Sequence, residues 1–348
     1  MCTSTGRPIP ASKVNPGEGK LPRIVSLFSG AGGLDWGFQK DNYEIIFAVD
    51  KDPDAVATHK NAFPQTFCEQ ADLVEMGATK LVKEIAKHLT PGESIGVIGG
   101  PPCQGFSRSN TKSTADDPRN QLPSLYLNIV SELAASYNVE FIVFENVIGI
   151  KDKKHEKTFN GIIDQLHKLG LHQVVNELDA YNFGVPQHRN RVIIAAFESE
   201  TALKAFKPKR EITGNKTVRE TIGDLPNPSF CCRGKTVVNK FHPNHWTMQP
   251  KSPRFTNPDS FSNQSRSFRK LDWDRPSPTV AYGHREIHVH PNGKRRLSIY
   301  EALLLQGFPT EFELTGSFSA QVQQVSNAVP PPLAYALAVA IQRALEVA

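Results

Sequence analysis

The chain has 348 residues, of which 39% are hydrophobic and 22% charged, which is typical of a globular protein rather than a disordered one. No apolar run approaches the roughly 18 residues that a membrane span requires, and the N-terminus lacks the apolar segment of a signal peptide. Five irregularly spaced cysteines favour a reduced, cytoplasmic protein without a disulfide framework.

The net charge of +5 is distributed unevenly along the chain. Residues 201–300 contain 19 Lys and Arg against 7 Asp and Glu, a net of +12, whereas the remainder has a net charge of −7. Charge runs often form only a solvated surface. Segregation on this scale instead favours a polyanionic partner for the basic segment.

The pattern of apolar residues predicts a doubly wound α/β fold with a mostly parallel sheet. Residues 1–20 are expected to form a flexible tail. The predicted strands cover Ile24–Phe28, Ile45–Val49, Ile95–Ile98, Phe141–Phe144 and Val192–Phe197. The predicted helices between them cover Asp54–Asn61, Ala78–His88, Leu122–Ser136 and Thr158–Leu169. In such folds, ligands bind at the carboxyl ends of the strands.

The composition changes near residue 200. Residues 205–295 are rich in Pro, Asn, Ser and Arg and predict a smaller, irregular domain. A helix is predicted over Ser298–Gln306, with Ser298 and Glu301 forming a capping box. The apolar segment Leu333–Val347 predicts a final helix.

A glycine-rich loop, Phe28-Ser29-Gly30-Ala31-Gly32-Gly33, follows the first predicted strand. Such a loop alone is equally typical of NAD-binding, nucleotide-binding and structural turns, but the spacing Gly-x-Gly-x-x-Gly is absent. Asp50 and Asp72 end the next two strand signals, where acids often only cap helices. Together they suit a cationic, ribose-bearing cofactor such as S-adenosylmethionine, on which Phe28 is positioned to stack.

A second loop, Gly99-Gly100-Pro101-Pro102-Cys103-Gln104-Gly105-Phe106-Ser107, follows the strand predicted at Ile95–Ile98. A free cysteine is usually buried as a small hydrophobic residue. Here two glycines and two prolines impose an unusual backbone path that presents the side chain. The loop therefore favours Cys103 as a nucleophile.

These strings resemble the DNA (cytosine-5) methyltransferases, in particular a bacterial restriction-modification methylase. Six strings occur in the order found in that family, from about residue 23 to the C-terminus, with one gap at residues 205–295. Besides the cysteine loop they are Leu27–Gly33, Phe144-Glu145-Asn146-Val147, Gln187-His188-Arg189-Asn190-Arg191, Leu305-Gln306-Gly307-Phe308-Pro309 and Ser326-Asn327-Ala328-Val329-Pro330. Arg296-Leu297-Ser298 also matches.

The resemblance implies methyl transfer from S-adenosylmethionine to carbon-5 of a cytosine within a short, specific duplex DNA sequence, after the base is flipped out. It implies that Cys103 adds to carbon-6, that Glu145 is the acid at ring nitrogen 3, and that Arg191 binds the base carbonyl. Arg189 would hold the local structure and charge. The implied cofactor contacts are Phe28, Gly30, Gly32, Asp50, Asp72, Pro102, Leu122 and Asn327, and the implied DNA contacts are Gln104, Ser107 and Thr279.

Two positions depart from the family pattern, which often has Glu at Asp50 and usually has Gly at Ser326. Neither departure is expected to abolish cofactor binding. The implied catalytic domain comprises residues 21–200 and 319–348, and the implied target-recognition domain comprises residues 201–318. No metal is expected, because the spacing of Cys231, Cys232, His242 and His245 matches no standard zinc pattern.

The expected partner is double-stranded DNA, with a cognate restriction endonuclease as a genetic rather than a physical partner. We expect a monomer in the cytoplasm, associated with the nucleoid when bound to DNA. The alternatives are a tRNA cytosine-5 methyltransferase of the same fold and a catalytically silent DNA-binding protein. The set of Cys103, Glu145 and Arg191 argues against the silent protein.

Overall fold

The computed structural model describes residues 21–102, 106, 121–210, 216–231, 239–257, 261, 268–279 and 288–348. The tail predicted at residues 1–20 lies outside the described residues, as do Cys103, Gln104 and Ser107.

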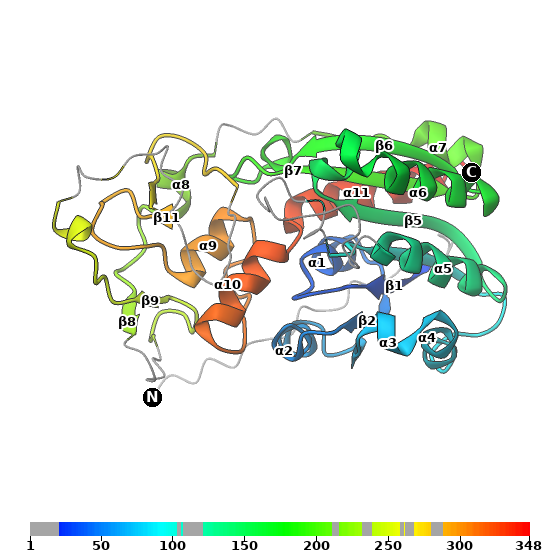
Figure 1. The fold of residues 1–348 in the computed structure, drawn as a ribbon, viewed down its shortest axis with the longest axis horizontal. Helices are drawn as coiled ribbons and strands as arrows, with labels where there is room; N and C mark the ends of the chain where they lie inside the picture. Colours follow the sequence, from blue (N-terminus) through cyan, green and yellow to red (C-terminus); the bar gives the residue numbers. More distant parts are fainter. Residues whose placement is uncertain are drawn as a thin grey trace.

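A seven-stranded sheet forms the larger part of the molecule, in the order β3-β2-β1-β4-β5-β7-β6 (Figure 1). All neighbouring strands are parallel except that β7 runs antiparallel to both β5 and β6. The strands are β1 (Arg23–Leu27), β2 (Ile45–Asp50), β3 (Phe67–Gln70), β4 (Ser94–Gly99), β5 (Asn138–Asn146), β6 (His172–Asp179) and β7 (Asn190–Phe197). The doubly wound, mostly parallel fold predicted from the sequence is therefore confirmed.

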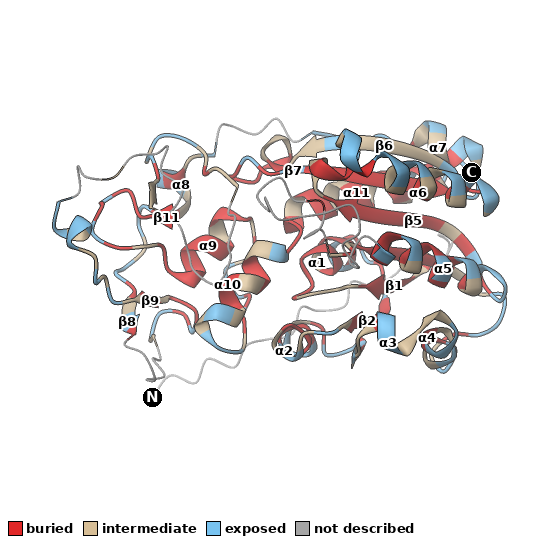
Figure 2. Ribbon diagram, viewed as in Figure 1, coloured by how far each residue is buried: buried red, intermediate tan, exposed pale blue. Residues whose placement is uncertain are grey.

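Helices cover both faces of this sheet, so that the buried strands lie between two helical layers (Figure 2). One layer contains α3 (Leu73–Met76), α4 (Ala78–Ile85), α5 (Leu122–Ala134) and α6 (Glu156–Lys168). The other contains α1 (Gly33–Lys40), α2 (Pro53–Ala62), α7 (Glu200–Ala205) and α11 (Pro331–Leu345). A Cβ on Gly37 would lie 2.4 Å from the Cβ of Ala334, so this glycine allows α1 and α11 to pack closely.

The strands predicted from apolar runs are all present, because central strands are buried on both faces and are therefore continuously apolar. Of the two edge strands, β3 was predicted only as the strand signal before Asp72, and β6 was not predicted. Most of its residues are only partly buried, and its polar side chains leave no apolar run for the pattern to detect.

The smaller part of the molecule contains short elements joined by long irregular segments (Figure 1). They are α8 (Val218–Ile222), β8 (Ser229–Cys231), β9 (Trp246–Met248), β10 (Arg269–Lys270), β11 (His288–Val289), α9 (Ile299–Leu305) and α10 (Phe318–Asn327). The capping box at the start of α9 is confirmed, since Ser298 accepts from the Glu301 N–H and Glu301 accepts from the Ser298 N–H. None of the helices in the described ranges has the length and apolar character to cross a membrane.

Asp41, at the C-terminal end of α1, is a buried carboxyl group whose charge is poorly compensated. Its side chain is 8% exposed, and its Oδ2 atom has no hydrogen-bond partner within the described chain. Burial raises its pKa to about 6, although the nearby Arg343 opposes the shift. Because the raised pKa favours the protonated form in the native state, Asp41 disfavours folding increasingly as the pH rises from about 4 through 6.

We therefore expect Asp41→Asn to stabilise the protein by about 1–3 kcal/mol at pH 8 and by much less at pH 4. Urea unfolding of both proteins at the two pH values measures this difference. A difference in free energy of unfolding that is independent of pH would contradict the explanation.

Candidate functional site

The predicted site residues that the structure describes are concentrated at one edge of the sheet. Five parallel strands, β1 to β5, end at this edge, and the antiparallel β7 begins there. Residues that are far apart in sequence, such as Gly30, Asp50 and Glu145, are therefore all at strand ends on the same side of the sheet.

The glycine-rich loop is attached to the end of β2 by Asp50. The Asp50 Oδ2 atom accepts a hydrogen bond of 2.9 Å from the Gly30 N–H, and Oδ1 accepts one of 2.9 Å from the Asp52 N–H. Burial raises the pKa of the Asp50 carboxyl, an effect that these backbone donors oppose. The carboxylate that was predicted to bind ribose hydroxyls thus also holds the loop, and its oxygens retain further acceptor capacity.

Two residues of this loop have backbone conformations that suit a ligand site. Gly30 has a φ of +54°, and no atom lies within 4 Å of the place where its Cβ would be, so the missing side chain leaves open space. Phe28, the residue that was predicted to stack on the cofactor, also has a φ of +54°, which is uncommon for a side-chain-bearing residue. Backbone strain of this kind is often found at functional sites.

Three buried polar side chains, Ser26, Asp35 and His59, form a hydrogen-bonded triad next to the glycine-rich loop. No sequence motif predicted this triad. Asp35 in α1 accepts hydrogen bonds of 2.6 Å from the Ser26 hydroxyl and from His59 Nε2, and all three side chains are fully buried. A Cβ on Gly32 would lie 2.2 Å from the ring of Phe63 and 3.1 Å from that of His59. Gly32 is thus required by close packing.

Three further predicted cofactor contacts, Asp72, Leu122 and Pro102, begin helices or precede the cysteine. Asp72 is the N-cap of α3 and accepts a 2.9 Å hydrogen bond from the Val74 N–H, which is the capping role weighed from the sequence. Leu122 is the first residue of α5 and is 8% exposed. Pro102, the last described residue before Cys103, is partly exposed.

The approach to the cysteine loop explains its two glycines. A Cβ on Gly99 would lie 2.4 Å from the carbonyl oxygen of Leu27, and a Cβ on Gly100 would lie 2.8 Å from Oε2 of Glu145. Asn146 donates a 3.2 Å hydrogen bond to the carbonyl of Pro101. Beyond the cysteine, Phe106 is fully buried in the core. Both sides of the loop are therefore anchored by described residues.

Glu145 and Arg191 form a buried ion pair, with 2.7 Å between Oε1 and Nε and side chains that are each 10% exposed. Arg191 Nη1 also donates to the carbonyl of Asn190 at 2.8 Å. Within the described part of the chain, Glu145 Oε2 and Arg191 Nη2 make no hydrogen bond. The pair thus presents one acceptor and one donor group, beside the backbone of Gly100.

Arg189, two residues earlier, is directed to a different partner. Its Nη2 donates to the carbonyls of Ser326 and Ala328, at 2.7 and 3.0 Å, in the turn that carries the predicted cofactor contact Asn327. Arg189 as a whole is 1% exposed. These contacts agree with the expectation that Arg189 holds local structure.

Thr279 lies next to the same arginine segment. Its hydroxyl donates a 2.6 Å hydrogen bond to the carbonyl of His188, and Ser277 pairs with Gln187 as an isolated bridge. The structure thus brings a residue predicted to contact DNA beside Arg189. Gln187 is itself fully buried, and both of its amide atoms have no hydrogen-bond partner in the described structure.

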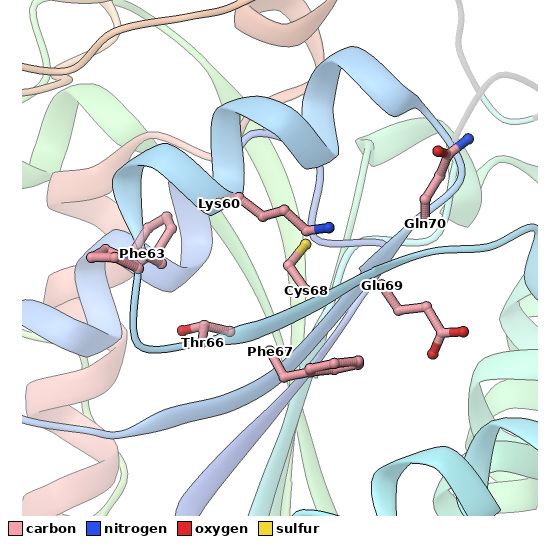
Figure 3. Close-up of a pocket in the computed structure, with 8 residues that line it drawn as sticks. Lys60, Phe63, Thr66, Phe67, Cys68, Glu69 and Gln70 are labelled. Atoms are coloured by element: carbon pink, nitrogen blue, oxygen red, sulfur yellow. The ribbon is translucent and has the colours of Figure 1, made fainter.

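A separate hollow of about 430 Å³ lies beside the edge strand β3, and none of the predicted site residues line it. Residues from the end of α2 and from β3 line it, and Lys60 and Cys68 point toward one another within it (Figure 3). Burial raises the pKa of the Cys68 thiol to about 12, so this cysteine lacks nucleophilic character.

Comparisons with known proteins identify the family. The family model for C-5 cytosine-specific DNA methylases matches residues 22–343. Type II methyltransferase M1.HphI of Haemophilus parahaemolyticus is 32% identical over 91% of this chain and 86% of its own length. Type II methyltransferase M.MthTI of Methanothermobacter thermautotrophicus is 32% identical over 93% of this chain and 98% of its own length.

Solved structures show the same fold. A putative DNA modification methyltransferase encoded within a prophage (E. coli) has a TM-score of 0.75 at 24% identity, and the match covers 94% of this chain and all of that one. DNMT2 of Spodoptera frugiperda has a TM-score of 0.63 at 18% identity, covering 92% of this chain and all of that one. The chain belongs to the C-5 cytosine-specific DNA methylase family.

Proposed function

We propose that this DNA (cytosine-5) methyltransferase adds a methyl group to a cytosine that is flipped out of a short, specific duplex sequence, with Cys103 as its nucleophile. The observation that carries the proposal is the Glu145–Arg191 pair beside the loop that leads to Cys103. A stacked base cannot reach such a buried pair. Flipping costs only a few kcal/mol, which contacts to the extruded base can offset.

The chemistry requires activation of carbon-5, which is not nucleophilic enough to accept a methyl group unaided. The Cys103 thiolate adds to carbon-6, while Glu145 donates a proton at ring nitrogen 3, so that carbon-5 becomes enamine-like. Arg191 Nη2 is suited to bind the base carbonyl oxygen. After methylation, the carbon-5 proton is lost to solvent, the thiolate is expelled from carbon-6, and the nitrogen-3 proton returns to Glu145, which restores the aromatic ring.

The family implies S-adenosylmethionine as the methyl donor, and the residues at the ends of β1 and β2 suit that group. The open space at Gly30 allows a ligand to approach the backbone, and Asp50 offers acceptor oxygens for ribose hydroxyls. The bound donor supplies an electrophilic methyl group. Phe28, Gly32, Asp72, Pro102, Leu122 and Asn327 complete the proposed contacts.

We assign catalysis to residues 21–200 and 319–348, together with α7, which packs on the sheet. Recognition of the target sequence is assigned to residues 206–318, which form the rest of the predicted 201–318 domain and whose excess positive charge suits the phosphates of duplex DNA. Gln104, Ser107 and Thr279 are proposed DNA contacts. Because several relatives are named Type II methyltransferases, we also propose a cytoplasmic monomer that acts on nucleoid DNA and has a restriction endonuclease as its genetic partner.

Methyl transfer from labelled S-adenosylmethionine to duplex DNA, with tRNA as the competing substrate, tests this function. We expect label in DNA alone, and we expect duplex DNA containing 5-fluorocytosine to form a covalent adduct, because the final proton loss is blocked. Cys103→Ala should abolish both results while leaving cofactor affinity near normal. Turnover by Cys103→Ala, or label in tRNA alone, would exclude the proposal.

Glu145→Gln tests the acid. The substitution keeps the shape of the side chain but removes the ionisable proton, so we expect the single-turnover rate to fall by roughly 10²–10⁴-fold with little change in DNA affinity. Glu177→Gln is the control, because Glu177 forms an exposed ion pair with Lys151. A variant that loses only DNA binding would show that Glu145 has a structural role.

Two glycine substitutions separate cofactor binding from folding. Gly30→Ala and Gly92→Ala each place a Cβ in open space at positive φ, so both should cost about 1–2 kcal/mol of stability. Gly92 precedes β4 at the opposite edge of the sheet, and we expect only Gly30→Ala to weaken S-adenosylmethionine binding, by roughly tenfold. Isothermal titration calorimetry without DNA measures the affinities. Equal affinities for the two variants would place the cofactor elsewhere.

A further inference from the structure

The turn Ser326–Ala328, which comprises the last two residues of α10 and its C-cap, is held by side chains from two other parts of the chain. Arg189 Nη2 donates to the carbonyls of Ser326 and Ala328, at 2.7 and 3.0 Å. Gln306, at the C-terminal end of α9, donates through Nε2 to the carbonyls of Val325 and Ala328, at 2.8 and 2.6 Å. The Ala328 carbonyl thus accepts from both side chains.

The sequence after α10 explains why this turn needs donors from elsewhere. The last carbonyls of a helix lack partners unless further N–H groups follow. Residues 330–332 are three consecutive prolines, which have no N–H group. In a continuing helix, the residue four positions later would donate to each carbonyl. For Ser326 that residue is Pro330, and for Ala328 it is Pro332, so neither carbonyl can be satisfied in this way. Arg189 and Gln306 supply the missing hydrogen bonds, and their side chains are 1% and 0% exposed.

We infer that Gln306 is a positioning residue for cofactor binding, acting together with Arg189 on Asn327. Asn327 is exposed and lies between two residues whose carbonyls are held, so its position depends on these hydrogen bonds. The inference rests on the proposed function, in which Asn327 contacts S-adenosylmethionine.

These hydrogen bonds also connect the region assigned to target recognition with the proposed base site. Gln306 ends α9, within the region assigned to target recognition, whereas Arg189 is two residues from Arg191 in the proposed base site. Both donate to the same carbonyl, that of Ala328. The cofactor turn therefore depends on the correct placement of both neighbouring regions.

Gln306→Met tests the inference, and Gln321→Met is a closely matched control. Gln321 is also buried, is 6% exposed, and donates through Nε2 to one backbone carbonyl, that of Gly316. In both glutamines Oε1 has no hydrogen-bond partner within the described residues. The control removes a similar buried amide at the opposite end of α10 from Asn327. Thermal unfolding compares the stability of the two variants.

For Gln306→Met we expect S-adenosylmethionine affinity without DNA to fall roughly tenfold, and KM for the cofactor to rise in parallel. The value of kcat at saturating cofactor should stay within about threefold of the wild type, because the missing contact is shared by ground and transition states. Gln321→Met should bind the cofactor with affinity within about twofold of the wild type.

Equal cofactor affinities for the two variants would overturn the inference, as would a loss confined to kcat. If Gln306→Met does not fold, Arg189→Lys provides the second test, since it keeps the charge but its side chain is one atom shorter, so that its ammonium does not reach the place of Nη2. Its cofactor affinity should fall, and an unchanged affinity would overturn the inference. A wild-type protein that fails to bind S-adenosylmethionine at all would instead refute the proposed function on which the inference rests.

Discussion

The glycine-rich loop of the proposed cofactor site depends on the hydrogen bonds of one buried carboxylate, that of Asp35. Removing a carboxylate from water is costly unless it is hydrogen-bonded, and here both of its oxygens are satisfied by Ser26 and His59. The three residues lie on β1, α1 and α2. Because His59 and Phe63 pack directly against Gly32, the triad holds the glycine-rich loop against a rigid base.

The helix that carries His59 also supports the segment on the other side of the proposed cofactor site. Thr58, the preceding residue, donates to Gln324 at 2.6 Å and accepts from the Thr315 N–H at 2.9 Å. Within α2, His59 therefore supports the glycine-rich loop, whereas Thr58 holds Thr315 and Gln324, which precede Asn327 in the chain. The two proposed groups of cofactor contacts thus share one support.

The reversal of a single strand brings the proposed catalytic pair together. Glu145 lies at the carboxyl end of β5, and Arg191 lies at the amino end of its neighbour β7. These ends meet because the two strands are antiparallel. If β7 were parallel, Arg189 and Arg191 would lie at the opposite edge of the sheet. The antiparallel strand in an otherwise parallel sheet is therefore what brings the two proposed catalytic residues to the same end of the sheet.

The sequence by itself determined the five inner strands of the sheet and the identity of most candidate residues, since buried strands are continuous apolar runs and most site loops directly follow them. It also predicted the capping box at Ser298, because such motifs depend on residues only three positions apart. Only the tertiary structure decided that Arg191 pairs with Glu145, that Arg189 and Gln306 hold the turn at Asn327, and that His59 bonds Asp35. These contacts depend on strand order, strand direction and helix packing, which bring together residues that no local pattern relates.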